Sequence, residues 1–296
     1  MTNTNNNTNW TPPCIAVQPI KASALPEALA LIERLQSQNG ASTASNPFGE
    51  AALLASTGKA QPEQWVLQLG DELPRLIRPD GVHWNIDYRQ GKARHRAAEP
   101  NRAHQPLARA LGLSKLTETE RQQWHVADGT AGAGSDGWQL AATGACVTLI
   151  EQHPVLFTML TSAVKAALNH PPTQPIAEKI NVINSTIEGS METLHSSVQG
   201  PINAVYLDPM YPVRRSKAAV KKPMQFIQAL VGKGPEPTAM LEHCLQAFNH
   251  HTSLNRVVVK RPSEAAAMIG KKDWHGQLVS VDAGAARFDI YLNPAP

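Results

Sequence analysis

WHVADGTAGAGSDGWQLAATGACVTLIE, residues 124–151, contains two short apolar runs separated by a glycine-rich turn and a helical segment. The runs at 124–128 and 146–150 have the length and composition of buried strands, and residues 136–143 between them have helical periodicity. A strand, a helix and a second strand in this order form a βαβ unit with two parallel strands. This stretch therefore predicts an α/β fold built on a parallel sheet.

The same alternation continues toward the C-terminus. Three further runs, INVIN, NAVYLD and RVVVKR, predict strands, with helices expected at 154–169, 190–197 and 236–250. The last two runs, QLVSVD and RFDIYL, have no helix between them, so we expect a hairpin or an antiparallel edge. The predicted fold class is α/β, with a Rossmann-like, mostly parallel sheet that ends in an antiparallel C-terminal hairpin.

The residues before this sheet predict a smaller, β-rich unit. Three extended runs, WVLQL, PRLIR and VHWNID, indicate a small subdomain that ends near Asp87, and residues 26–38 have helical periodicity. The polar start, MTNTNNNTNW, is expected to be a disordered tail, and the Ala/Ser/Gly-rich residues 39–63 a loop. The expected domains are a variable, partly disordered N-terminal segment at 1–62, a small N-terminal subdomain at 63–115 and the main domain at 116–296.

The composition limits the class of protein. Of the 296 residues, 42% are hydrophobic and 17% are charged, which is typical of a globular protein with a core. The net charge of +3 permits a polyanionic partner without requiring one. The three cysteines match no zinc spacing and no metal-ligand cluster is apparent, so no metal is expected. Without an apolar run of about 18 residues or a signal peptide, we expect a cytoplasmic protein, monomeric by default.

The glycine-rich turn indicates a site for a nucleotide-like ligand. Gly132 and Gly134 let a ligand approach the backbone, and the helix that follows presents free N–H groups. Asp128 ends the first strand, and Glu151 ends the second, where a ribose hydroxyl pair is held in such folds. A turn without a ligand and a solvated strand-end acid are the competing interpretations, but the combination favours a binding site.

The carboxylate of Asp128, which precedes the glycine loop, helps to identify that ligand. The turn reads Asp-Gly-Thr-Ala-Gly-Ala-Gly, whereas a dinucleotide binder would have Gly-x-Gly-x-x-Gly and no acid near the phosphates. S-adenosylmethionine (SAM) carries an ammonium and a sulfonium and has no phosphate. Charge complementarity therefore favours SAM over a nicotinamide dinucleotide. Asp128 and the glycine loop are expected to bind its methionine and ribose end, and Glu151 its ribose.

A second motif, VYLDPMYP at 205–212, ends the fourth strand of the sheet. Ligands in open α/β sheets bind at the carboxyl ends of strands, so this turn is expected to face the same crevice as the glycine loop. It resembles the Asp-Pro-Pro-Tyr/Phe turn of amino-group methyltransferases, with Met210 replacing the second proline. Asp208 and the Pro209 carbonyl would orient an exocyclic amine, and Tyr211 would stack on the base for about 1–3 kcal/mol. An ordinary β-turn is the alternative.

Three groups of basic residues are expected to form a phosphate-binding rim around the pocket, although scattered surface charge is the alternative for each. A base in structured nucleic acid would have to be flipped out to reach the turn, at a cost of a few kcal/mol. The candidates are Arg94, Arg96 and Arg102 before the sheet, Arg214, Arg215, Lys217, Lys221 and Lys222 after the turn, and Lys260 and Arg261 at the end of RVVVKR.

Four segments of the sequence together resemble the bacterial ribosomal RNA small subunit methyltransferase J family. They are VADGTAGAGSD, LIEQHPV, VYLDPMYPVRRSKAAVKKPMQ and RVVVKRP with RFDIY. The resemblance extends from about residue 70 to the C-terminus and is most specific at 205–225. It implies a SAM-dependent enzyme that methylates the N2 amine of a guanine in 16S rRNA. By position, its cofactor contacts fall on Ser135, Asp136, Glu151, Gln152, Gly189, Ser190 and Asp208.

Other functions remain alternatives to this one. The same turn chemistry suits adenine N6 or a protein amide as the methyl acceptor. A non-catalytic RNA-binding relative would keep the fold, although the intact turn at 208–212 and the glycine loop argue against it. Ser135 and Gln152 depart from the family pattern, which has basic residues at these positions.

Overall fold

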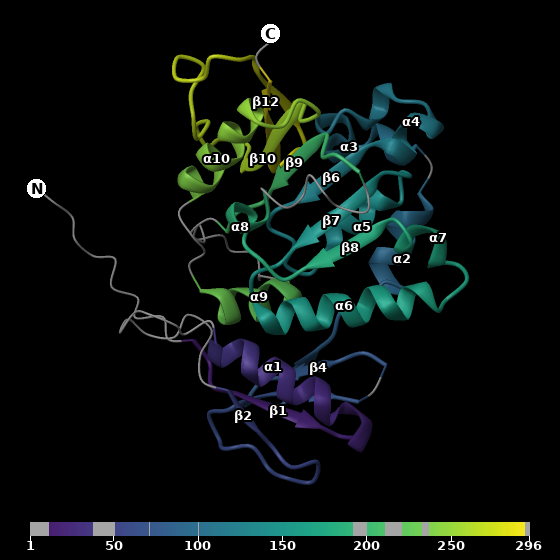
Figure 1. The fold of residues 1–296 in the computed structure, drawn as a ribbon, viewed down its shortest axis with the longest axis vertical. Coiled ribbons are helices and arrows are strands. Elements are labelled where there is room, and N and C mark those ends of the chain that lie inside the picture. The colour runs from purple at the N-terminus through teal and green to yellow at the C-terminus, as the bar shows by residue number, and fades with distance from the viewer. Residues whose placement is uncertain are drawn as a thin grey trace, which may run out of the picture. The chain divides into compact units, whose positions relative to one another are not determined.

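The computed structural model describes residues 12–37, 51–70, 72–99, 101–191, 200–210, 221–232 and 237–293. Contacts divide the chain into two compact units, each with its own sheet (Figure 1). The first unit comprises residues 1–85 and 211–234, and the second comprises residues 86–210 and 235–296. The three domains expected from the sequence, with boundaries after residues 62 and 115, stay a prediction.

The first unit contains a five-stranded sheet of order β2-β1-β3-β4-β5. Strand β1 pairs in parallel with β2 and β3, and β4 pairs antiparallel with β3 and β5. The strands are β1 (Ile15–Pro19), β2 (Ala51–Leu53), β3 (Trp65–Leu69), β4 (Arg75–Ile77) and β5 (His83–Trp84). The prediction of a small β-rich unit is therefore confirmed. Residues 15–19, for which the sequence analysis predicted no strand, form the fully buried strand β1.

Two helices belong to the first unit. Helix α1 (Leu25–Ser37) buries Ala28, Leu31 and Leu35, whose spacing places them on one helical face. Helix α9 (Lys222–Val231) contributes Phe226, whose ring centroid lies 5.5 Å from that of Trp65 and 5.6 Å from that of Trp84. The core of this unit is thus built from segments far apart in the sequence.

The second unit contains a seven-stranded sheet of order β11-β12-β10-β9-β6-β7-β8. Strands β10, β9, β6, β7 and β8 are neighbours in this order and pair in parallel, whereas β12 is antiparallel to β10 and to β11. The strands are β6 (His125–Asp128), β7 (Cys146–Ile150), β8 (Ile180–Ile183), β9 (Ala204–Leu207), β10 (Arg256–Pro262), β11 (Leu278–Asp282) and β12 (Ala286–Leu292). The predicted fold class, including the antiparallel C-terminal hairpin, is confirmed.

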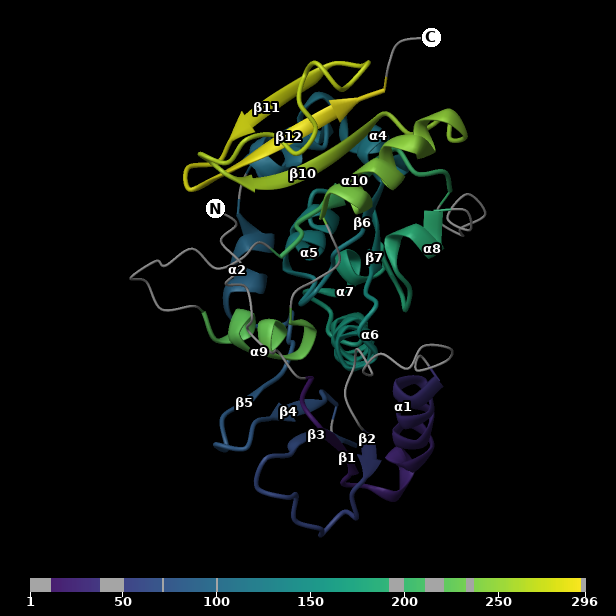
Figure 2. The same cartoon turned by 90° about the vertical axis from the view of Figure 1, so that its left-hand side faces the viewer.

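Helices cover both faces of this sheet (Figure 2). On one face α8 (Ile187–Met191) and α10 (Pro237–Gln246) pack on Val205, Leu207, Val257 and Val259. On the other face α5 (Ser135–Ala141) lies so close that a Cβ at Gly137 would overlap Leu149 of β7. The remaining α-helices are α2 (Gly91–Ala98), α3 (Pro106–Ala110), α4 (Glu118–Gln123), α6 (Pro154–Leu168) and α7 (Gln174–Ala177).

Several helices differ from the sequence-based expectations. The helix expected at 190–197 begins earlier, as α8, and residues 192–199 lie outside the described ranges. The helix expected at 236–250 consists of α10 and a short 3₁₀ turn at Ala247–Asn249. Helices α2, α4, α7 and α9 were not expected. Across the described ranges, no helix combines the length and hydropathy needed to cross a bilayer.

Candidate active site

Three strand ends meet at one edge of the second unit's sheet. Strand β6 lies between β9 and β7, and its last residue, Asp128, pairs with Tyr206 of β9 and Leu149 of β7. The glycine loop after β6, Glu151 after β7 and Asp208 after β9 are therefore brought together. This is the arrangement expected from the sequence, because the carboxyl ends of parallel strands share an edge.

The glycine loop is held by an aromatic stack that the sequence did not reveal. Gly132 and Gly134 have left-handed φ angles of 54° and 66°, which favour glycine. A Cβ at Gly134 would overlap the Tyr88 hydroxyl oxygen. That hydroxyl donates a 2.8 Å hydrogen bond to the Ala133 carbonyl, and the Tyr88 ring stacks on Trp138 at 4.5 Å. Tyr88 and Trp138 thus fix the path of the loop.

Glu151 is tied to the same loop. Its side chain accepts hydrogen bonds from the Gly132 N–H at 2.8 Å and the His153 N–H at 2.7 Å, one on each carboxylate oxygen. Glu151 is only 6% exposed, and this burial raises its pKa to about 7. The Asn184 side-chain amide donates to the carbonyls of Glu151 and Gln152 and so fixes the end of β7 beside the end of β8. A carboxylate has about four acceptor positions, so Glu151 can also accept a hydrogen bond from a hydroxyl donor.

Asp128 is buried at the centre of this edge, with an exposed fraction of 2%. Burial, reinforced by the nearby carboxylates of Asp136 and Asp208, raises its pKa to about 8. Its Oδ1 accepts a hydrogen bond from the Thr130 N–H, and the Thr130 hydroxyl accepts one from the Asp208 N–H at 2.7 Å. Thr130 therefore links the glycine loop to the turn after β9.

A lysine bridges two of the carboxylates. The Lys260 ammonium lies 2.7 Å from Asp208 Oδ2 and 3.1 Å from Asp136 Oδ2. The Tyr206 hydroxyl donates a 2.7 Å hydrogen bond to the same Asp136 oxygen. Burial raises the pKa of Asp208, and Lys260 opposes that rise. The two carboxylates raise the pKa of Lys260 above its ordinary value, although burial acts in the opposite direction. The lysine is therefore a permanent cation at this edge.

The charges at this edge suit a cationic ligand. Four carboxyl groups surround the glycine loop and the turn after β9, and Lys260 is paired with two of them. A phosphate placed here would be repelled, whereas a ligand with an ammonium and a sulfonium would be stabilised. In the described ranges, no three His, Cys, Asp or Glu side chains are arranged to hold a metal ion.

Comparisons with known proteins agree with this geometry. A family described as "Putative SAM-dependent methyltransferase" matches residues 59–293. A protein named ribosomal RNA small subunit methyltransferase J from Pseudomonas paraeruginosa is 33% identical over 230 residues, which cover 78% of this chain and 79% of that protein. Its namesake from Dechloromonas aromatica is 31% identical over 84% of this chain and 95% of that protein. The chain belongs to the ribosomal RNA small subunit methyltransferase J family.

Membership in the methyltransferase J family establishes the class of enzyme and its cofactor. The protein is a SAM-dependent methyltransferase, as the sequence predicted, and its cofactor is SAM. A solved structure of a SAM-dependent methyltransferase from Neisseria gonorrhoeae shares the fold, with a TM-score of 0.62 and 24% identity over 96% of this chain and 97% of that one.

The remaining cofactor contacts expected for a methyltransferase J are placed around the same edge. Ser135 is exposed as the first residue of α5. Gly189 and Ser190 lie in α8, where the Ser190 hydroxyl donates to the Thr186 carbonyl at 2.8 Å. Helix α8 reaches the glycine loop, because a Cβ at Gly129 would lie 3.0 Å from Ile187 Cγ1. The roles of these residues stay predictions.

The residues expected to contact the base and the RNA are only partly described. Pro209 is buried directly after Asp208, whereas Tyr211, Arg214, Arg215, Lys217 and the side chain of Arg96 lie outside the described parts. In the second unit Arg94 is exposed on α2, Arg102 is half-buried, and Arg261 donates to the Ala266 carbonyl at 2.7 Å.

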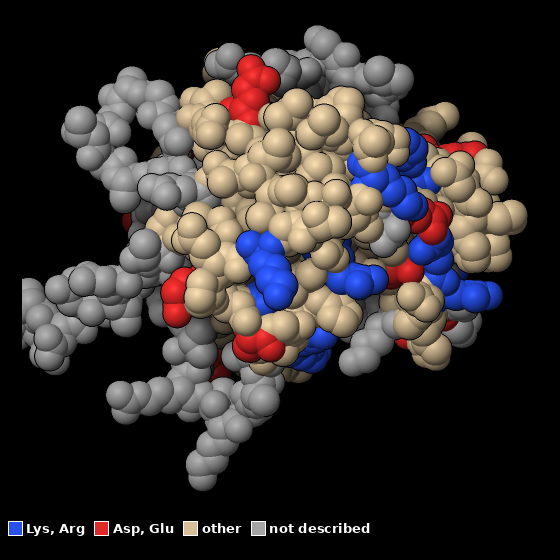
Figure 3. Space-filling model, turned by 90° about the horizontal axis from the view of Figure 1, so that it is seen from below, with Lys and Arg blue, Asp and Glu red and all other residues tan. Residues whose placement is uncertain are grey.

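Lys221 and Lys222 are exposed at the start of α9, in the first unit. On the face of the molecule in Figure 3, lysine and arginine side chains are interspersed with acidic ones. The described part of that face therefore carries no continuous patch of purely basic or purely acidic side chains.

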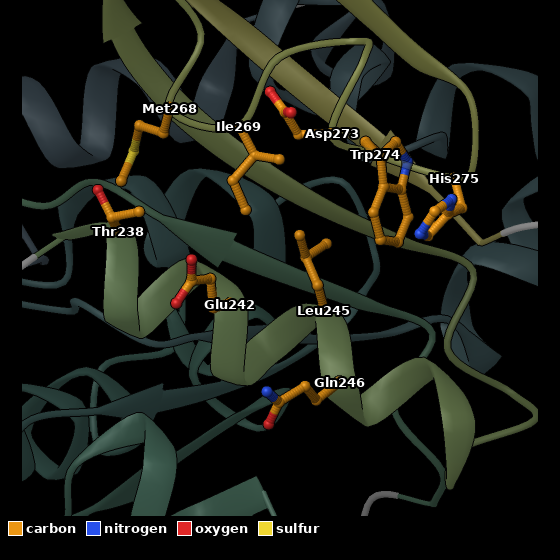
Figure 4. Close-up of a pocket in the computed structure, with 9 residues that line it drawn as sticks. All are labelled: Thr238, Glu242, Leu245, Gln246, Met268, Ile269, Asp273, Trp274 and His275. Atoms are coloured by element: carbon orange, nitrogen blue, oxygen red, sulfur yellow. The ribbon is translucent and has the colours of Figure 1, made fainter.

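A separate cavity of about 450 Å³ lies between α10 and the loop before β11 (Figure 4). Its lining combines apolar side chains, such as Leu245 and Trp274, with acidic Glu242 and Asp273. None of the residues expected to bind SAM or RNA lines it. The cavity is therefore distinct from the edge where the strand ends meet.

Proposed function

We propose that this methyltransferase transfers a methyl group from SAM to the N2 exocyclic amine of a guanine in the 16S rRNA of the small ribosomal subunit. The observation that carries the proposal is the position of Asp208, which follows β9 directly beside the glycine loop. The names of the relatives support small-subunit rRNA as the substrate. We place the reaction in the cytoplasm, where that RNA is found.

The turn after β9 is proposed to position the acceptor. SAM supplies an electrophilic methyl group. Asp208 and the Pro209 carbonyl accept hydrogen bonds from the amine and draw its nitrogen toward tetrahedral geometry, which counteracts delocalisation of the lone pair into the purine. As positive charge develops on that nitrogen, the Asp208 carboxylate stabilises it. Asp208 then lies closest to the proton that the methylated nitrogen must lose. Tyr211 stacks on the base.

The cofactor is proposed to lie along the glycine loop. Asp128 and the loop bind its methionine and ribose end, and Glu151 binds the ribose hydroxyls. Asp136, beside Lys260, adds negative charge close to the cationic end. The other proposed contacts are Gly132, Gly134, Ser135, Gln152, Gly189, Ser190 and Asp208.

The basic residues are proposed to hold RNA phosphates that flank the target base. Arg94, which is exposed on α2, and Lys222, which is exposed at the start of α9, have the accessibility that this role requires. Such contacts act through charge and not through base identity. They would hold the backbone in place while the guanine leaves its stack.

SAM binding is expected to release protons near neutral pH. Asp128 and Glu151 have pKa values of about 8 and about 7, so both hold protons for part of the time at pH 7. The cationic end of SAM beside Asp128, and the ribose hydroxyls that donate to Glu151, favour the ionised carboxylates, so SAM affinity rises with pH as these two groups lose their protons. Calorimetric titration at pH 7 in two buffers of different ionisation enthalpy measures the number of protons released.

The matched variants for that titration are Asp128→Asn and Glu151→Gln, which keep the shape but remove the ionisable group. Each is expected to reduce both the proton release and the pH dependence of SAM affinity. An affinity that stays constant from pH 6 to pH 9 in the unaltered protein would contradict the proposed location of the cofactor.

The proposed reaction is tested with small ribosomal subunits from cells that lack this gene. Labelled methyl from SAM is expected to appear as N2-methylguanosine at a single 16S rRNA position, identified by mass spectrometry of the nucleosides. Subunits from cells that have the gene are the control, and they should take up little label. Label in N6-methyladenosine or in protein would disprove the guanine assignment, and SAM binding without transfer would indicate a non-catalytic RNA-binding role.

A further inference from the structure

We propose that Lys260 is a positioning residue, which holds the Asp208 carboxylate ionised and in one orientation for the acceptor amine. This inference rests on the proposed role of Asp208 in methyl transfer. Lys260 was expected on the RNA-binding rim, but its contacts with two carboxylates favour a different role. An ammonium so paired has much of its charge offset and attracts a phosphate less strongly.

The register of the sheet places the lysine beside the turn. Strands β9 and β10 are parallel, and Val259 pairs with Leu207, the last residue of β9. Strand β10 continues past this pair, so Lys260 adjoins Asp208. Val259 and Leu207 face the α8 and α10 side, and alternation along a strand directs Lys260 and Tyr206 to the other side. That side carries α5, which supplies Asp136.

Lys260 counteracts the factors that disfavour ionisation of Asp208 at this edge. Burial disfavours the ionised form of Asp208 most strongly, and the nearby Asp136 carboxylate from α5 adds to this effect. A protonated Asp208 would present a donor where the amine needs an acceptor, and it could not stabilise positive charge on the nitrogen. Lys260, from β10, binds Asp208 Oδ2, and the amine is proposed to bind Oδ1.

The same lysine joins the cofactor loop to the catalytic turn. Asp136 follows the glycine loop and accepts from both Lys260 and the Tyr206 hydroxyl. Asp208 is bound by Lys260 and, through its backbone N–H, by Thr130 of the loop. The acceptor site and the cofactor site therefore share one hydrogen-bonded network, in which Lys260 is the link between their carboxylates.

The test uses Lys260→Met, Lys260→Arg and, as matched control, Lys165→Met at an exposed position of α6. The first readout is the carboxyl ¹³C titration of Asp208 in the SAM-free protein, with the signal assigned by its loss in D208N. K260M is expected to raise the titration midpoint, K260R to restore it, and K165M to leave it unchanged. This readout requires neither substrate nor cofactor.

The second readout is the pH profile of kcat on small subunits. K260M is expected to lower kcat at neutral pH by about 10²-fold and to shift the acidic limb of the profile to higher pH, with partial recovery in K260R. Should K260M fail to fold, K260Q replaces it in both readouts. An unchanged midpoint, or an unchanged profile in an active variant, would overturn the role of Lys260. If the unaltered protein did not methylate guanine, the proposed function would fail, while the titration would still decide whether Lys260 controls Asp208.

Discussion

Asp208→Ala is expected to lower kcat for methyl transfer by about 10²–10³-fold, while SAM binding is largely retained because Asp208 is one of several proposed cofactor contacts. The carboxylate is proposed to orient the amine and to stabilise the charge that develops on it, so its loss acts mainly on the transition state. The substitution also leaves Lys260 with Asp136 as its remaining carboxylate partner among the ion pairs that the structure describes. Single-turnover transfer to small subunits measures the first effect, and calorimetric titration with SAM the second.

Asp208→Asn is the control for this prediction. Asparagine keeps one acceptor oxygen and the shape of the side chain but removes the charge. It is therefore expected to be more active than the alanine variant and less active than the unaltered protein. Normal turnover in Asp208→Ala would remove Asp208 from the mechanism, and with it the basis for the role of Lys260.

Gly134→Ala is expected to destabilise the second unit by about 2–5 kcal/mol and to weaken SAM binding. A left-handed φ of 66° costs an alanine about 1–2 kcal/mol. The new methyl group would also overlap the Tyr88 hydroxyl, and overpacking of this kind costs about 1–3 kcal/mol. Denaturant unfolding followed by tryptophan fluorescence measures the loss, because Trp138 stacks on Tyr88.

Gly91→Ala separates the two causes. Gly91 has nearly the same φ, 63°, but its Cβ would meet no atom within 4 Å, so only the backbone cost applies. Combining Gly134→Ala with Tyr88→Phe removes the overlapping oxygen and should recover part of the stability. If Gly134→Ala were no more harmful than Gly91→Ala, the aromatic stack would not fix the loop.

The strand ends could be predicted because they depend on local signals. Asp128, Glu151 and Asp208 each end an apolar run, and a parallel sheet brings the ends of its strands to one edge. The hydrogen bond from the Gly132 N–H to Glu151 is a direct consequence of that topology. The alternation of strands and helices and the C-terminal hairpin were predictable for the same reason.

Other features depend on contacts that leave no local pattern. Strand β1 pairs with residues near 51 and 65, and its single short apolar run follows a polar tail. Tyr88 contacts the glycine loop from a segment that reads as basic and polar. The pairing of Lys260 with Asp208 follows from the neighbouring positions of β9 and β10, which the sequence alone does not specify. The only signal for this pairing in the sequence was a lysine at the end of one predicted strand and an aspartate at the end of another.

The membership of α9 in the first unit has a consequence for synthesis of the chain. Most of that unit's sheet lies within the first 85 residues, but Phe226, which packs on Trp65 and Trp84, is translated after β6 through β9 of the second unit. A nascent chain that ends at Asn85 therefore leaves two tryptophans without one of their packing partners. Synthesis of the first unit begins first, yet the unit can be completed only after the turn that follows β9 has been made.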